Sequence, residues 1–338
     1  MENLGLVGFT GAGANRLFSA LTGLPVPSEY EAAVGIATVP DERHDRLAVM
    51  SESKKVVPTG IELVHLALPP GTKPGEGLGT RFIGALRNTD AILIVLRAFA
   101  DSGVEPDAEG DLAAIELELV MADVESVENR LTRHRKALKA RDPQVVAEVG
   151  ALERALPILS EGTPLYRADL SADDRALLAP AFLLTAKPML VVCNSGEQPD
   201  VAPVIAGAVS VPIDIEAEIA AIEPDARAEM REMYGVGESA LAQVAGAAYH
   251  LLGRRTFLTT GDKESRAWTF RAGAKAPECA GVIHSDLQRG FIRAEVIRWD
   301  ELLEIGSWSK ARDAGKLRVE GKDYEVADGD VLEIRFNV

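Results

Sequence analysis

The sequence predicts an α/β fold built on a mostly parallel sheet, followed by a smaller α+β module. Short apolar runs rich in β-branched residues recur at 60–68, 91–96 and 189–194, as in strands that are buried on both faces. The chain opens with an apolar run at 3–8 that passes through a glycine-rich turn into a helical pattern at 16–24. The last ~80 residues carry short strands and one helix instead.

Length and composition limit the number of domains and the classes of function that the chain can have. The chain has 338 residues, which exceeds one typical core and predicts two or three domains. The formal charge of -16 opposes indiscriminate binding to nucleic acid, although a local basic patch is still able to contact RNA. Two cysteines and the lack of an apolar run of about 18 residues predict a cytoplasmic protein without a membrane span. The spacing of the five histidines predicts no metal site.

A long helical insertion lies between the runs at 91–96 and 189–194. Two apolar stripes with 3-4 spacing predict an antiparallel helical hairpin with its turn at Asp142 and Pro143. The stripes consist of Leu117, Val120, Val124, Val127, Leu131 and Leu138, and then Val145, Val149, Leu152, Leu156 and Leu159. The tip is basic, with Arg130, Arg133, Arg135, Lys136, Lys139 and Arg141. Such a run is typical of a solvated helix face, and the alternative is a finger that contacts RNA phosphates.

The C-terminal strands are predicted at 266–271, 291–298 and 331–336. In the second of them, Ile292, Ala294 and Val296 alternate along the strand and are expected to face one way. The pair Gly321-Lys322 predicts a hairpin between 317–319 and 324–326. These strands and one helix predict a module with its own core.

The glycine-rich turn after the first strand carries the functional argument. A phosphate-binding loop GxxxxGK[ST] wraps phosphates in backbone N–H groups, supplies a Lys, and uses a hydroxyl for Mg²⁺. Gly8 and Gly13 fit this frame, with Gly11 and Ala12 between them. However, Ala14 occupies the Lys position and Asn15 the hydroxyl position. By motif alone, the match is weak.

Over essentially its whole length the sequence resembles the YchF (Obg-like) family of P-loop NTPases. The resemblance is dense at 39–48, 54–63, 75–79, 184–188 and 215–220, and it is closest at 280–297 and 311–324. It implies a P-loop G domain at 1–110 and 185–255, an inserted helical hairpin at 111–184, and a C-terminal TGS domain at 256–338. A TGS domain is a ubiquitin-like β-grasp module. The resemblance also implies association with the ribosome, its RNA or a translation factor through the hairpin and the TGS domain.

The same resemblance marks where this chain departs from the family. The family's loop ends Gly-Lys-Ser-Thr, and the residues that match are Gly13, Ala14, Asn15 and Arg16. His65 and Leu68 stand where the family has the Asp and the Gly of its Asp-x-x-Gly motif. The switch region at 27–35 has no Thr, and residues 212–214 replace a Ser-Ala-type turn. The base-recognition motif Asn-x-x-Glu, which favours adenine over guanine, remains as Asn194 and Glu197.

These departures predict a pseudo-NTPase that acts as a binding module. Without the Lys, the hydroxyl, the Asp and the Thr, we expect background hydrolysis and no Mg²⁺ site. We still expect weak ATP binding, because the loop amides can contact phosphates and Asn194 and Glu197 can contact the base. Two alternatives stay open. One is a slow ATPase in which Arg16 or a partner's cation replaces the Lys, and the other is a protein that binds no nucleotide.

Overall fold

The computed structural model describes residues 3–28, 32–66, 68, 77–101, 103–137, 142–198, 201–237 and 239–337, leaving aside the side chains of 135–137 and 224. The chain divides into two compact units. Unit 1 contains residues 1–37 and 62–244, and unit 2 contains residues 38–61 and 245–338. The backbone therefore passes from one unit to the other three times.

The first sheet is the α/β sheet that the sequence predicts, with strand order β2-β4-β1-β5-β6-β7. The pairs β1–β4, β1–β5, β5–β6 and β6–β7 are parallel. In the middle of the sheet, β5 is buried from Ala91 to Leu96, as expected for a strand covered on both faces. The strands are β1 (Asn3–Val7), β2 (Ala33–Val39), β4 (Thr59–His65), β5 (Ala91–Arg97), β6 (Met189–Asn194) and β7 (Val209–Val211).

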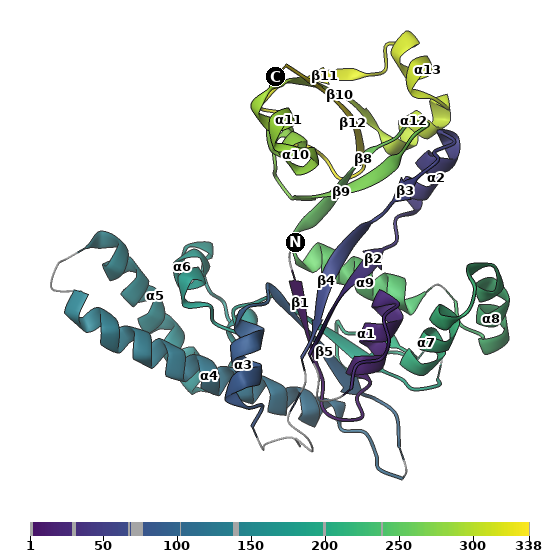
Figure 1. Ribbon diagram of the computed structural model, residues 1–338. Coiled ribbons are helices and arrows are strands. Elements are labelled where there is room, and N and C mark those ends of the chain that lie inside the picture. The colour runs from purple at the N-terminus through teal and green to yellow at the C-terminus, as the bar shows by residue number, and fades with distance from the viewer. Residues whose placement is uncertain are drawn as a thin grey trace. The chain divides into compact units, whose positions relative to one another are not determined.

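Helices cover this sheet and extend from it (Figure 1). They are α1 (Ala14–Thr22), α3 (Thr80–Arg87), α4 (Ala108–Ala137), α5 (Pro143–Ser160), α6 (Ala172–Leu178), α7 (Ile213–Ala221), α8 (Arg227–Tyr234) and α9 (Ala240–Leu251), with short 3-10 turns at Leu165–Arg167, Ala179–Ala181 and Pro224–Ala226. Phe82 and Leu86 of α3 pack with Ile92 and Ile94 of β5 in the core of the sheet.

The predicted helical hairpin is formed by α4 and α5, which lie side by side (Figure 1). Val120, Val127, Leu152 and Leu159 belong to one buried cluster between them. The prediction for Leu117 is wrong, because this side chain is 51% exposed. The reason is that the first turns of α4 pack on the sheet through a different stripe that contains Leu112, Ile115 and Leu119. Leu138 lies outside the described residues.

The second sheet forms the centre of unit 2, with strand order β11-β10-β12-β8-β9-β3. It is mixed: β12 runs parallel to β8, and β8–β9, β10–β11 and β10–β12 are antiparallel. The strands are β3 (Val56–Val57), β8 (Arg254–Thr259), β9 (Ser265–Arg271), β10 (Phe291–Arg298), β11 (Arg318–Glu320) and β12 (Asp330–Phe336). The helices are α2 (Glu42–Met50), α10 (Ala276–Ile283), α11 (Ser285–Arg289), α12 (Trp299–Ile305) and α13 (Trp308–Asp313).

Two local predictions for unit 2 are wrong. Ile292 is 55% exposed, whereas Phe291, Ala294 and Val296 are buried, because an irregularity in the register of β10 between Phe291 and Arg293 reverses the alternation. The predicted hairpin around 321–322 is absent from the described strands. Instead β11 pairs with β10, and Glu325 makes an isolated bridge with Lys275.

Residues 38–61, which the sequence analysis placed in the G domain, cluster with unit 2. Leu47 of α2 is fully buried in a cluster with Leu258, Ile297 and Val331, so its apolar surface completes the core of the C-terminal module. The strand β3 pairs in parallel with β9, and the Arg43 guanidinium bonds Asp328 Oδ2 at 2.7 Å. The unit that surrounds the C-terminal sheet is therefore assembled from two separate stretches of chain.

Candidate functional site

The glycine-rich loop connects β1 directly to α1, as the sequence predicts. Helix α1 begins at Ala14, and its N-cap residue Gly13 offers no side-chain cap. Backbone bonds from Ala12 N to Phe9 O, at 3.0 Å, and from Leu17 N to Gly13 O, at 2.9 Å, close the loop onto the helix. The orphan N–H groups at such a helix start favour an anion.

Two glycines of the loop are required for different reasons. Gly13 has a φ of 93°, and a Cβ there would lie 2.7 Å from Asn194 Nδ2. Gly8 has ordinary dihedrals, but a Cβ there would lie 2.9 Å from Val95 O. The loop therefore keeps the close backbone approach of a phosphate loop even though the Lys is absent.

A small cavity of about 30 Å³ lies over the loop. Its lining consists of Gly8, Phe9, Thr10, Gly11, Gly13, Ala14, Asn15, His65, Leu66 and Leu68. The structure thus brings the two predicted positions after β4, His65 and Leu68, against the loop. Such a volume holds one or two water molecules, whereas ligand pockets are typically about 300–1,000 Å³.

The residues around this cavity do not fit a magnesium-bound triphosphate. No Lys or Arg lines it among the described residues. Asn15 Oδ1 accepts a bond from Arg16 N at 2.9 Å, and Leu66 and Leu68, each 8% exposed, contribute apolar carbon to the lining. The imidazole of His65 is 4% exposed and lies 6.0 Å from the ring of Phe18, centroid to centroid. Among the described motif positions, Ala14, Asn15, His65 and Leu68 offer Mg²⁺ neither a carboxylate nor a hydroxyl, and Thr10 is the hydroxyl residue of the cavity lining.

Arg16 is not among the described residues that line this cavity. Its guanidinium forms an ion pair with Asp214, at the start of α7. Both residues stand at positions that the sequence analysis expected to differ from the family: Arg16 follows the expected hydroxyl position, and Asp214 lies in the segment 212–214. The two charges compensate each other in the ion pair, so neither is left alone.

Asn194, at the end of β6, is 2% exposed and holds the loop to the neighbouring turn. Its Nδ2 donates to Ala12 O at 3.0 Å, and its Oδ1 accepts from Gly196 N at 2.9 Å and from Ile213 N at 3.3 Å. Its amide therefore stabilises the site itself. Glu197 is exposed and does not line the cavity over the loop.

The basic tip of the hairpin is only partly described. Arg130 forms an ion pair with Glu148 of α5, and His134 Nε2 lies 3.4 Å from the same carboxylate. Arg133 is exposed. Arg135 and Lys136 lie on α4 with side chains outside the described set, and Lys139 and Arg141, like residues 29–31 of the switch region, lie outside the described residues.

Charge divides unevenly between the two units. Unit 2 holds 19 basic and 19 acidic residues, so the whole formal charge of -16 belongs to unit 1. Phosphates approaching unit 1 are therefore repelled except near its local cations. In the described part of the chain, no helix has the length and hydropathy of a membrane span, and no group of three His, Cys, Asp or Glu side chains has metal-binding geometry.

Sequence reasoning missed the partners of the candidate residues. Glu148 neutralises part of the basic tip, and Asp214 receives Arg16. The opposite charges of Arg16 and Asp214, at two predicted nucleotide motifs, were a usable signal for the second contact. Phe9 and Leu66 were not singled out, because an apolar side chain gives no sign in the sequence that it closes a cavity.

Comparisons with known proteins give one consistent result. A family model named YchF-GTPase_C, described as a protein of unknown function (DUF933), matches residues 255–337. The chain is 39% identical to the "Ribosome-binding ATPase YchF" of Bacillus subtilis (strain 168) and 36% identical to that of Escherichia coli O157:H7, with 99% of each chain covered. The solved structure of the Schizosaccharomyces pombe YchF GTPase superposes with a TM-score of 0.85 at 27% identity, covering 99% of this chain and 97% of the other.

Proposed function

The chain belongs to the YchF family, and from this premise we propose that it is a ribosome-associated binding protein whose nucleotide site no longer hydrolyses ATP or GTP. In this role the α/β unit is a scaffold, and the hairpin and the C-terminal module supply the partner-facing surfaces. The relatives named as ribosome-binding ATPases support the ribosome as the partner, which also implies a cytoplasmic location.

The observation that carries the proposal is the cavity of about 30 Å³ over the loop. Phosphoryl transfer depends on positioning and charge neutralisation, and the residues at these positions supply neither. Ala14 brings no charge, and Leu68 adds an aliphatic side chain to the lining beside the loop. Weak ATP binding, if retained, requires the loop to open, and the acidic surface of unit 1 opposes it.

The topology of unit 2 supports its classification as a TGS, or β-grasp, module. A β8–β9 hairpin precedes helix α10, and the last strand β12 inserts beside β8 in parallel. Its balanced charge allows it to approach an RNA-rich particle that unit 1 repels. The exposed Arg133 supports a second contact, from the hairpin to phosphate, whereas Arg130 is already paired with Glu148.

The slow-ATPase alternative has less support. Arg16 would have to leave Asp214 and expose that carboxylate before it approached a phosphate. Arg16 also lies two residues after Ala14 in the first turn of α1, about 200° around the helix axis, so it does not reproduce the direction of the missing Lys.

Measuring phosphate release with ATP and with GTP, both with Mg²⁺, tests the loss of hydrolysis. The Bacillus subtilis relative serves as the positive control. We expect background rates for this chain and no heat of binding for Mg²⁺–ATP at micromolar concentrations. Turnover equal to that of the relative would refute the proposal.

Sedimentation with ribosomes over a range of salt concentrations tests the partner. We expect binding that weakens with salt, and Arg133→Glu should lower the slope of log K against log salt by about 1 or more. Arg81→Glu, an equal charge change at another exposed position of unit 1, is the matched control. If the wild-type chain stays in the supernatant at low salt, the ribosome proposal fails.

A further inference from the structure

The strands β8 and β12 separate part-way along their length. Gly329 N donates to Thr256 O at 2.8 Å, and Val331 is in register with Leu258. No further register pair joins these two strands among the described residues, although β12 continues to Phe336. On its other side β12 pairs with β10 up to Phe336. One edge of β12 from Glu333 to Phe336 is therefore unpaired inside the sheet.

The end of β8 is held away from β12 by contacts to residues 47–54. Thr260 Oγ1 bonds Ser51 Oγ at 2.8 Å and Leu47 O at 3.2 Å. Ser53 Oγ donates to Gly261 O at 2.7 Å, and Lys54 N donates to the carbonyl oxygen of Asp262 at 3.1 Å. The opening between the strands is thus fixed by specific bonds to a third segment and is not a frayed strand end.

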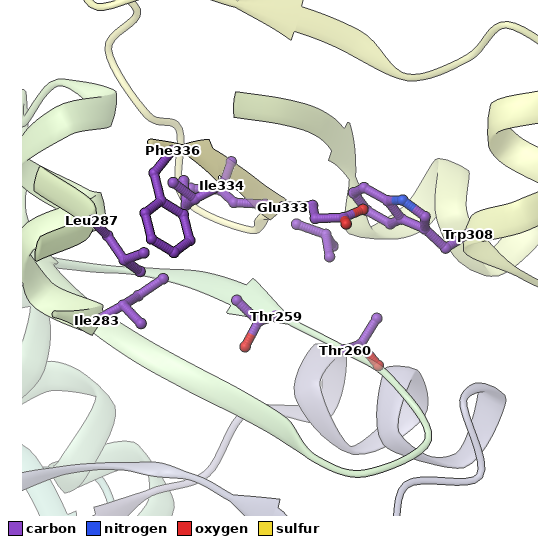
Figure 2. Close-up of a pocket in the computed structure, with 10 residues that line it drawn as sticks. Thr259, Thr260, Ile283, Leu287, Trp308, Glu333, Ile334 and Phe336 are labelled. Carbon is purple, nitrogen blue, oxygen red and sulfur yellow. The ribbon is translucent and has the colours of Figure 1, made fainter. Parts of the chain in front are cut away.

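This opening is a pocket of about 440 Å³ with apolar walls. Figure 2 shows Ile334 and Phe336 of β12 close to Ile283 and Leu287, with Thr259 and Thr260 on the other side and Trp308 at the far end. Phe336 is 46% exposed, which is unusual for an aromatic side chain next to a core. We call this pocket the strand slot.

We propose that the strand slot binds an extended peptide segment of a partner protein, which adds to β12 as a new strand. The free edge of four residues spans about 13 Å and presents backbone N–H and C=O groups, for which another backbone is the matching ligand. An apolar side chain of the peptide would lie among Ile283, Leu287 and Phe336. The proposal goes beyond the nucleotide site and does not depend on it.

Charge favours a peptide over RNA. Among the described residues, Glu333 is the one charged side chain that lines the slot, and its carboxylate lies 3.1 Å from Arg335 and 3.3 Å from Arg312. The slot thus offers no free cation to a phosphate, and its apolar walls would desolvate one. A compact apolar molecule would fill the walls but cover the backbone edge without pairing its N–H and C=O groups, which is costly.

The test uses the full chain and a phage-displayed library of random linear peptides of about ten residues, long enough to span the free edge. Selection is made on the wild-type chain after depletion on a Phe336→Asp variant. We expect an enriched peptide whose dissociation constant rises at least about tenfold on Phe336→Asp. The same peptide with N-methyl groups on alternate residues should bind at least about tenfold more weakly, because its backbone donors are blocked.

The control is Val319→Asp, which introduces the same charge at a 61% exposed valine on the outer strand β11 and should leave the affinity unchanged. Hydrogen exchange on the wild-type chain gives a readout that needs no variant: the peptide should slow exchange within 332–336. Protection at 318–320 instead, equal binding of the N-methylated peptide, or no enrichment over the depleted library would each overturn the proposal.

Discussion

The carboxylate of Asp123 accepts hydrogen bonds from both the backbone amide and the hydroxyl of Thr185, at 2.7 and 2.8 Å. A third bond comes from Leu184 N at 2.9 Å. Asp123 lies on α4 and is fully buried, whereas Thr185 lies shortly before β6. Burial raises the pKa of Asp123, although the three donors oppose that rise. One side chain therefore fastens the hairpin to the segment that enters the sheet.

Replacing Asp123 should destabilise the protein strongly. Asp123→Ala leaves two buried N–H groups without an acceptor, and we expect a loss of about 3 kcal/mol in the free energy of unfolding. Asp123→Asn should rescue only part of this, because its amide N–H would face one of the backbone donors. Urea denaturation gives the values. Glu125→Ala, at an exposed position of the same helix, is the control, with an expected change within about 0.5 kcal/mol. Equal losses for the two alanine variants would contradict the argument.

The ion pair between Arg16 and Asp214 should contribute modestly. Their side chains are 57% and 27% exposed, so solvent screens the pair. A double-mutant cycle with Arg16→Ala and Asp214→Ala should give a coupling of about 0.5–1 kcal/mol that shrinks in 1 M salt. Arg16→Ala should also leave nucleotide affinity unchanged. A loss of ATP binding in that variant would instead favour the slow-ATPase alternative.

Gly13 and Gly11 provide a matched pair of substitutions in the loop. Both have positive φ, 93° and 85°, but a Cβ at Gly11 meets no atom within 4 Å, whereas one at Gly13 meets Asn194 Nδ2. Gly11→Ala should cost about 1 kcal/mol for the backbone alone. Gly13→Ala should cost about 2 kcal/mol more, because Asn194 must move and lose its bond to Ala12 O. Thermal denaturation of both variants measures the difference, and equal costs would show that Asn194 adapts freely.

The burial of Lys187 should make the stability of the protein depend on pH in a specific way. Burial lowers its pKa to about 8. Its ammonium donates to Arg87 O at 2.9 Å and to Thr89 O, at the end of α3. The unfolded chain keeps this proton up to about 10.5, so between about pH 8 and 10.5 the unfolded state binds more protons. The contribution of Lys187 to stability should therefore rise with pH across that window.

The test compares the wild-type chain with Lys187→Met by urea denaturation at several pH values. Other groups titrate in the same range with opposite sign, since burial raises the pKa of Cys279 to about 12. Only the difference between the two curves isolates Lys187. We expect the free energy of unfolding of the wild type to increase relative to that of Lys187→Met as the pH rises from 8 to 10. A constant difference in this free energy would show that Lys187 titrates normally.

The sequence predicted the parts of the fold that rest on local patterns. The buried run of β5, the turn from β1 into α1 and the apolar stripes of the hairpin all have periodicities that survive in the structure. The side of β10 that Ile292 faces was not predictable, because a single irregularity in register reverses the alternation after it. The predicted burial of Leu117 was wrong for a related reason. Helix α4 packs into two cores, so no single apolar stripe describes which of its residues are buried.

The candidate site was predictable as a set of positions but not as a set of contacts. The motif comparison located the loop, His65, Leu68 and Asn194, and the structure places all of them around the loop. It could not show that the amide of Asn194 is committed to the protein itself, or that Arg16 has a partner 198 positions away. Such long-range pairings depend on the fold as a whole.

Residues 38–61 belong to the same compact unit as the C-terminal module. Cleaving the chain at one position therefore cannot separate the complete module from the rest of the protein. A fragment starting at 245 would lack Leu47, which would leave a cavity beside Leu258 and Val331. It would also lack β3, so the outer edge of β9 would be unpaired and prone to aggregation. Proteolysis in the 62–244 stretch would likewise not release a clean C-terminal half. Any truncation study, or any exchange of this module between relatives, has to carry both stretches of chain together.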